Sequence, residues 1–357
     1  MLNINFKLYE LNKNFDLKSF IHTKFQKYNN LYMTIDYINL YSNKNSKNYL
    51  FLFEKNKKSW AHIFQKSEIN DKFIKDKNIK YYDIESPYGF YGPISNSEDK
   101  NFINQANNFF DQWCCKNNII AEFIRFNPLL SNHNLRTTCD ISVERKNLFF
   151  NLNNLDNHKN FKIFNSKIMN QINNYKKYNL EIVESHKDSD YFDFIKIYLE
   201  NMKNLKVHKF YEFNDKFYKE LLKLIKKNGY LLICRSSSEV IGGTIILFDK
   251  INVYYFLSAI NKDYKISGIS NSLIYFAIQK TSDIKRKIFY LGGGNSSSSD
   301  DNLFKFKKKM SNEQCNFYIG KKIFIKSIYE RVCRNWSFSN NSLYKRYNKY
   351  LLKYKFN

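Results

Sequence analysis

The order of strand and helix patterns repeats in the two halves of this chain, and that repeat constrains its fold most strongly. Each half shows three strand patterns, then an amphipathic helix pattern, then another strand pattern. In the first half these lie at 48–54, 59–64, 80–84, 99–117 and 118–126, and in the second at 230–235, 240–248, 251–259, 270–282 and 287–291. Recurrence at an offset of about 170 residues predicts two copies of one α/β unit.

Further helices are predicted at 161–178, 190–204 and 214–227, a short strand at 180–183 and a final strand at 315–319. The tail from Lys321 carries ten basic residues and one acid, Glu330. Its apolar residues fall on one helical face: Ile325, Ile328, Tyr329, Val332 and Trp336. Such a stripe predicts a terminal helix that packs on the core of its own domain, and a helix lying on a membrane surface is the alternative.

The net charge of the chain, 357 residues long, is +25, from 58 Lys and Arg against 33 Asp and Glu. A basic balance favours an anionic partner such as nucleic acid or a membrane surface. However, 50 lysines accompany 50 asparagines, with only eight arginines and five alanines. That usage is typical of an A/T-rich genome, and guanidinium groups, which bind phosphate bidentately, are scarce. The charge alone therefore leaves codon bias and function both open.

Several classes of protein are excluded by what the sequence lacks. Hydrophobic residues make up 43%, enough for a substantial core. No run approaches the ~18 apolar residues of a membrane span, and no apolar signal segment opens the chain, so we expect a cytoplasmic protein. The six cysteines form no CxxC and the six histidines no HxxxH, so we expect no metal site.

Two glycine-containing segments and one lysine mark the candidate chemistry. Ser86–Pro93 holds two of the three prolines and two of the ten glycines, which predicts a loop with fixed backbone needs. Gly292, Gly293 and Gly294 follow a predicted strand and allow a sharp turn or the close approach of a ligand. Phe306 and Lys307 then place a flat apolar group beside an ammonium group.

These segments resemble the FemA/FemB/FemX group of aminoacyl (peptidyl) transferases, in the wider GNAT superfamily of acyl-CoA N-acyltransferases. The matching segments run in order over most of the chain: 86–93, 123–130, 172–180, 201–202, 211–213, 255–259, 291–294 and 306–307. In the GNAT fold, a loop of the pattern Arg/Gln-x-x-Gly-x-Gly/Ala opens the helix after the fourth strand and binds the pyrophosphate of acyl-CoA. Here Lys265, Gly268 and Ser270 occupy that pattern, with Lys in place of Arg or Gln and Ser in place of Gly.

The resemblance implies an α/β fold of two fused GNAT-like domains, each a mixed, mostly antiparallel sheet flanked by helices. The first domain is expected at 1–150 and the second at 151–320, with the helix of 321–357 packing back on the first. The family's lysine at the reaction centre corresponds to Lys307, with Phe306 beside it. That lysine would stabilise the oxyanion of a tetrahedral intermediate or neutralise a phosphate group, and a solvated lysine in a Lys-rich run is the alternative.

By the same resemblance, the chain transfers an acyl group from CoA, or an aminoacyl group from aminoacyl-tRNA, as co-substrate; no cofactor stays bound. The acceptor would be an amine of a cell-envelope precursor for peptidoglycan or polysaccharide, as a sugar nucleotide or lipid-linked molecule, with peripheral contact to the inner membrane left open. Donor-binding residues are Lys265, Gly268, Ser270, Gly292, Gly293 and Gly294. The long coiled-coil insertion of some tRNA-dependent members is absent, which leaves CoA and tRNA both open as donors.

Acceptor binding is assigned to Tyr88, Tyr91, Arg125 and Tyr255. The tyrosines of the 86–93 loop would stack on a sugar or base, or else pack in the core. Arg125 would hold an anionic group, or pair with a buried carboxylate such as Glu122. Four carboxylates near the two loops, Asp83, Glu85, Asp300 and Asp301, are interpreted as cap or turn residues.

Two other functions remain compatible with the sequence. One is a non-catalytic nucleic-acid-binding protein that uses the Lys-rich tail and its aromatics. The other is an inactive double-GNAT scaffold, which the degenerate pattern at Lys265–Ser270 favours.

Overall fold

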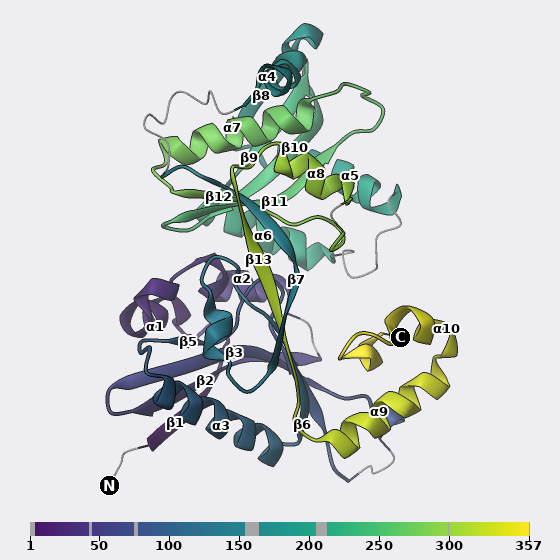
Figure 1. Ribbon diagram of the computed structural model, residues 1–357. Helices are drawn as coiled ribbons and strands as arrows, with labels where there is room; N and C mark the ends of the chain where they lie inside the picture. The colour runs from purple at the N-terminus through teal and green to yellow at the C-terminus, as the bar shows by residue number, and fades with distance from the viewer. Residues whose placement is uncertain are drawn as a thin grey trace. The chain divides into compact units, whose positions relative to one another are not determined.

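The computed structural model describes residues 4–42, 45–74, 78–153, 164–204, 213–298 and 300–356. The chain divides into two compact units, Met1–Glu144 with Asn316–Asn357, and Arg145–Cys315. Each unit contains a mixed sheet with helices (Figure 1). The first unit is therefore discontinuous in sequence.

The sheet of the first unit begins with four strands in antiparallel succession, β1 (Ile4–Glu10), β2 (Ser46–Lys55), β3 (Lys58–Glu68) and β4 (Tyr82–Glu85). Helix α3 (Lys100–Lys116) then leads to β6 (Ile119–Arg125), which runs parallel to β4. Strand β13 (Glu313–Ile323), from the far end of the chain, pairs antiparallel with β6. The two-residue strand β5 (Ile94–Ser95) pairs with β3.

Helices close the first unit. The face of α3 that carries Phe102, Ala106 and Phe110 is buried, as the periodicity predicts. Short helices α1 (Leu17–Lys24) and α2 (Ile35–Leu40) connect β1 to β2. Helix α9 (Lys326–Ser339) buries Tyr329, Val332 and Trp336 in a cluster with residues of β6 and of the loop after β3. The apolar stripe of the tail therefore packs on the tail's own unit, and α10 (Asn341–Tyr347) follows it.

The second unit repeats this topology. Strands β8 (Leu180–Ser185), β9 (Gly229–Ser236), β10 (Glu239–Phe248) and β11 (Asn252–Ile260) follow one another antiparallel. Helix α7 (Ile269–Asp283) leads to β12 (Ile288–Gly292), parallel to β11, and β7 (Asp140–Asn151) pairs antiparallel with β12. The predicted repeat of three strands, a helix and a further strand is confirmed, and in both units that further strand pairs in parallel.

Helices lie on both faces of this second sheet (Figure 1). Helix α4 (Ser166–Asn173) packs against α7, and both contribute to one apolar cluster with the sheet. Helices α5 (Asp188–Asn204) and α6 (Asp215–Asn228) pack on β9 and β10, and the side chain of Asn214 caps α6. The predicted start of the 161–178 helix lies outside the described residues, and its end is a 3₁₀ turn at Asn174–Tyr178.

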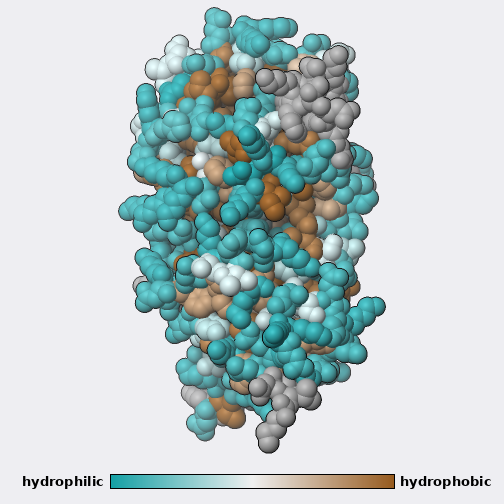
Figure 2. Space-filling view, turned by 90° about the vertical axis from the view of Figure 1, so that its left-hand side faces the viewer, coloured by the Kyte–Doolittle hydropathy of each residue, from teal (hydrophilic) through white to brown (hydrophobic). Residues whose placement is uncertain are grey.

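The surface is mainly hydrophilic, in agreement with the many polar and charged residues of the sequence. Figure 2 shows a face covered mainly by hydrophilic side chains, with hydrophobic ones in scattered groups. No described helix is long and apolar enough to cross a bilayer.

Candidate functional site

The candidate site of the second unit lies where two parallel strands part. β11 and β12 pair only over Asn252–Tyr254 and Ile288–Tyr290. Beyond Tyr254, β11 continues to Ile260, whereas β12 ends at Gly292. Tyr255 is thus the first β11 residue past the paired stretch, and the three glycines follow at the corresponding end of β12.

The glycine segment is fixed by its neighbours. Gly292 has φ +74°, a left-handed conformation that glycine adopts without strain. At Gly293, a Cβ would lie 2.5 Å from Oδ1 of Asn147, so a side chain at this position would require Asn147 of β7 to shift. Arg145 of the same strand donates from Nη1 to the carbonyl of Gly294 at 3.0 Å. The segment is therefore a rigid turn held by β7.

Lys307 lies in α8 (Asn302–Lys308), whose first turn is capped by the side chain of Asp301. Its side chain is buried, at 9% exposed, whereas Lys305, Lys308 and Lys309 are exposed. The Nζ atom donates to the carbonyl of Gly293 at 3.0 Å and lies 5.7 Å from the centre of the Tyr255 ring. Lys307 thus differs from the lysines beside it and joins the glycine turn to β11.

Burial also changes the proton affinity of this lysine. Removal from water lowers the pKa of Lys307 to about 8, and the negative charge of Asp301 opposes that shift only in part. At neutral pH the group is a buried ammonium ion with one carbonyl as its hydrogen-bond partner. Burial likewise raises the pKa of Tyr255 to about 12, so its hydroxyl stays neutral. Phe306 is half-buried and packs against the apolar cluster of this unit.

The other predicted donor-binding residues lie in the loop after β11 and in the first turn of α7. Lys265 is exposed and Ser270 half-buried. Gly268 precedes the first turn of α7 with φ +96°, and a Cβ there would lie 2.2 Å from the carbonyl oxygen of Gln171 in α4. The close contact with α4 therefore already requires glycine at this position, independently of any ligand.

The predicted acceptor residues divide between the units, since Tyr255 belongs to the second and the other three to the first. Tyr91 is fully buried and its hydroxyl donates to the carbonyl of Tyr32, so it is a core residue. Tyr88 is half-buried, with its ring centre 4.3 Å from that of Tyr41.

Arg125 donates to the carbonyl of Ser86 and lies 3.6 Å from the carboxylate of Glu85. The suggested pairing of Arg125 with Glu122 is wrong, because Glu122 binds His62 and Arg136 instead.

Two of the four carboxylates interpreted as cap or turn residues have a different role. Asp83 is buried, and Lys355 Nζ lies 2.7 Å from both its carboxylate and that of Glu85. Burial raises the pKa of Asp83 to about 6, although the charge of Lys355 lowers it. The interpretation holds for Asp301, which caps α8. Asp83 and Glu85 instead anchor the end of the chain to β4.

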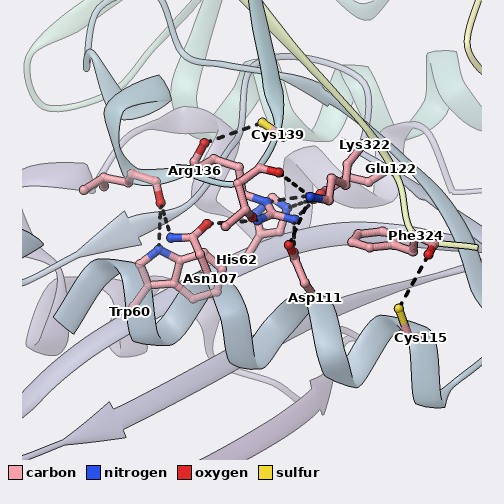
Figure 3. Close-up of polar contacts among 12 residues, drawn as sticks. Trp60, His62, Asn107, Asp111, Cys115, Glu122, Arg136, Cys139, Lys322 and Phe324 are labelled. Carbon is pink, nitrogen blue, oxygen red and sulfur yellow. Dashed lines mark hydrogen bonds and ion pairs between the residues drawn. The ribbon is translucent and has the colours of Figure 1, made fainter. Parts of the chain in front are cut away.

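A buried polar network in the first unit escaped the sequence reasoning (Figure 3). Arg136 is fully buried and donates to Glu122 at 2.7 Å and to Asp111 at 2.6 Å, while Nε2 of His62 lies 2.7 Å from Glu122. Burial by itself raises the pKa of Glu122, but the charge of Arg136 and the bond to His62 bring it to about 2. In the sequence, the only sign of this network was the scarcity of arginine, because Arg136 is one of only eight arginines. With Arg136, His62 and Glu122 all at most 1% exposed, the network is a core element.

Among the described residues, no group of three or more His, Cys, Asp or Glu side chains could hold a metal ion.

Comparisons with known proteins show that this chain is similar in fold to several solved structures. No protein-family model matches the chain, and no curated protein sequence matches it. FemX is similar with a TM-score of 0.64 and 10% identity, over 91% of this chain and 99% of that one. A tandem GNAT protein from the clavulanic acid biosynthesis pathway has a TM-score of 0.51 and 5% identity, over 89% and 98%.

A third similar structure is the C-terminal domain of a protein described as a lysylphosphatidylglycerol synthetase, from Agrobacterium fabrum. Its TM-score is 0.51 and its identity 11%, over 79% of this chain and 85% of that one. The predicted fold, two fused GNAT-like domains as in FemX, is confirmed.

Proposed function

We propose that this protein is an N-acyltransferase or aminoacyltransferase that acts on an amino group of a cell-envelope precursor. The observation that carries the proposal is Lys307, a buried ammonium ion held between the glycine turn and Tyr255 where β11 and β12 part. Within the described residues Lys307 forms no ion pair, and the burial of such a charge is poorly explained by stability alone because it is costly. The FemX-like fold supports the same reading.

In the proposed reaction, the acceptor nitrogen attacks the donor's carbonyl carbon, and negative charge develops on the carbonyl oxygen. The ammonium of Lys307 stabilises that charge, and its low-dielectric surroundings strengthen the effect. The carbon–sulfur bond of a thioester, or the carbon–oxygen bond of an aminoacyl ester, then breaks. The nitrogen loses a proton, and the leaving group takes one. Phe306, the residue before Lys307, packs against the apolar cluster of this unit.

Donor phosphates are assigned to the start of α7, with Lys265, Gly268 and Ser270, and to the turn of Gly292, Gly293 and Gly294. A helix N-terminus favours an anion. The tandem GNAT structure is described as being without acetyl-CoA, and this mention of acetyl-CoA makes a CoA thioester the first donor to test. Aminoacyl-tRNA stays the second donor to test. Tyr88, Arg125 and Tyr255 remain proposed acceptor contacts, whereas the burial of Tyr91 limits it to supporting that loop.

The test is a donor screen with mass-spectrometric detection of the product. Acyl-CoA and charged tRNA are each incubated with amino-sugar nucleotides and lipid-linked peptide precursors. We expect one donor to give an N-acylated product, and Lys307→Met to lower kcat/KM by roughly 10²–10³-fold, as for loss of an oxyanion donor. The matched control is Lys305→Met, because Lys305 is an exposed lysine of the same helix, paired with Asp300.

Unchanged turnover in Lys307→Met would refute the proposed mechanism. Absence of product from every donor and acceptor pair would favour the inactive scaffold instead.

A further inference from the structure

Exposed aromatic and basic side chains occur in the last turn of α9, in α10 and just beyond it. Figure 1 shows these helices near the C-terminus of the chain. Six exposed residues make up what is called here the tail patch: Phe338, Tyr344, Lys345, Arg346, Lys349 and Tyr350. The apolar stripe of α9 is used by the core, so these are different residues from those that the sequence suggested for a membrane helix.

The segment that carries the tail patch is firmly attached. Trp336 is fully buried and donates from Nε1 to the carbonyl of Phe356 at 2.9 Å. Tyr329 donates to the carbonyl of Leu351 at 2.8 Å, and the rings of Tyr347 and Phe356 stack at 4.0 Å. The tail patch is therefore exposed although the segment that carries it is packed on the first unit.

The charges of the tail patch are not neutralised by acids. The sequence contains no Asp or Glu after Glu330. Within the described residues, Lys345, Arg346 and Lys349 form no ion pair; Arg346 lies over the ring of Tyr347 at 5.4 Å and Lys349 over that of Tyr350 at 5.8 Å. Elsewhere on the surface, lysines such as Lys223 are paired, in that case with Glu220. The tail patch is thus a local concentration of uncompensated positive charge.

The partner must accept an apolar ring as well as cations. Phe338 is 79% exposed, more than any other large hydrophobic residue of the described chain, and forms no ring contact among the described residues. A nucleic acid would favour a platform of rings on which bases stack. An exposed phenyl group on the same segment as exposed tyrosines and cations fits the interface of an anionic bilayer, where rings enter the headgroup region and cations bind lipid phosphates.

We infer that the tail patch docks the protein on the surface of an anionic lipid bilayer. The inference stands on the first unit alone and does not depend on the proposed reaction. It is tested without donor or acceptor.

The experiment is co-flotation of the full chain with large unilamellar vesicles, either of pure phosphatidylcholine or of an equimolar mixture with phosphatidylglycerol. We expect binding to the mixed vesicles only. Replacement of Lys345, Arg346 and Lys349 by Ser should weaken it by about a hundredfold, since each basic residue near such a surface contributes about a fivefold gain. Phe338→Ser should weaken binding roughly tenfold.

The matched controls are a Lys13→Ser, Lys18→Ser, Lys100→Ser variant, with the same loss of charge from other exposed sites of the unit, and Phe192→Ser, at another exposed ring. Both should bind like the wild type, and circular dichroism checks that each variant is folded. Equal binding to neutral vesicles, equal loss in the controls, or no vesicle binding at all would overturn the inference. The inference would also be overturned if the protein did not bind vesicles but bound unfractionated tRNA, and if that tRNA binding were lost when the tail-patch residues were replaced.

Discussion

At the scale of the residue, Lys307 shows how burial sets a protonation state. The unfolded chain holds this lysine at its ordinary pKa near 10.5, and the folded chain lowers the pKa to about 8. Between these values the unfolded state binds more protons than the folded state, so stability rises with pH in this window. Below pH 8 both states are protonated and the full cost of the buried charge is present.

We therefore expect the free energy of unfolding of the wild type to increase relative to that of Lys307→Met as pH is raised from about 7 to about 10, by up to about 3 kcal/mol. Urea unfolding at a series of pH values measures the difference. Lys305→Met, at an exposed position, should show no such trend. A flat difference for Lys307→Met would mean that the ammonium is solvated.

Arg136 illustrates a buried ion whose partners are in place. Its guanidinium group contacts Glu122 and Asp111 and has no exposed surface. Removing one partner of such a network leaves the others charged and without compensation in a low dielectric.

Arg136→Met should thus lower stability by about 3–5 kcal/mol. The control Lys24→Met, which removes the more exposed pair of Lys24 and Glu54, should cost less than about 1 kcal/mol. Adding Glu122→Gln to Arg136→Met should restore part of the loss, because one uncompensated charge disappears. Thermal and urea unfolding provide both values, and equal costs for the two single variants would contradict the assignment.

At the scale of the element, the junction between β11 and α7 depends on the close approach of α4. Gly268 has a positive φ and leaves no room for a Cβ against the backbone of Gln171. Gly292 also has a positive φ, but an added Cβ would find its nearest neighbours at 3.8 and 3.9 Å.

A comparison of alanine substitutions at Gly268 and Gly292 separates the cost of backbone strain from the cost of steric contact. Gly292→Ala should cost about 1–2 kcal/mol, for the left-handed conformation alone. Gly268→Ala should cost clearly more, because α4 or α7 must also shift, and hydrogen exchange should rise at the contact of these helices. Similar unfolding midpoints for the two variants would show that the junction relaxes freely.

The helices and strands also show what the sequence can and cannot predict. Strands such as β3 and β9 were found because apolar, β-branched and aromatic residues mark buried strands. β7 was missed because Glu144, Arg145 and Lys146 interrupt its pattern, and α8 because seven residues carry too little periodicity. Lys307 was singled out by its place after the glycines and by the resemblance to the FemA/FemB/FemX group, and its catalytic role stays a prediction. The Arg136 network was not, because its members come from separate elements and only the fold brings them together.

At the scale of the whole molecule, the first unit is assembled from both ends of the chain. β13 supplies the antiparallel neighbour of β6, and α9 supplies Val332 and Trp336 to the core. The second unit draws on one continuous stretch of sequence.

A chain ending at Cys315 should accordingly lose the first unit and keep the second. We expect fast hydrogen exchange in peptides from β2, β3 and β6, and native protection in those from β9 and β10, since exchange follows local opening. The full chain is the control for both sets of peptides. Retained protection of β2 and β3 in the truncated chain would show that residues 1–144 fold without their C-terminal partner.

The discontinuity of the first unit also has a consequence for synthesis on the ribosome. Domains fold as units while the polypeptide emerges, the N-terminal one usually first. We expect that order to be reversed here: Arg145–Cys315 can complete its core once it has been synthesised, whereas residues 1–144 must wait for the later residues that form β13 and α9. Until then the edge of β6 lacks its partner strand, and we expect a stall of translation before α9 to leave a nascent protein in which only the unit of Arg145–Cys315 is native.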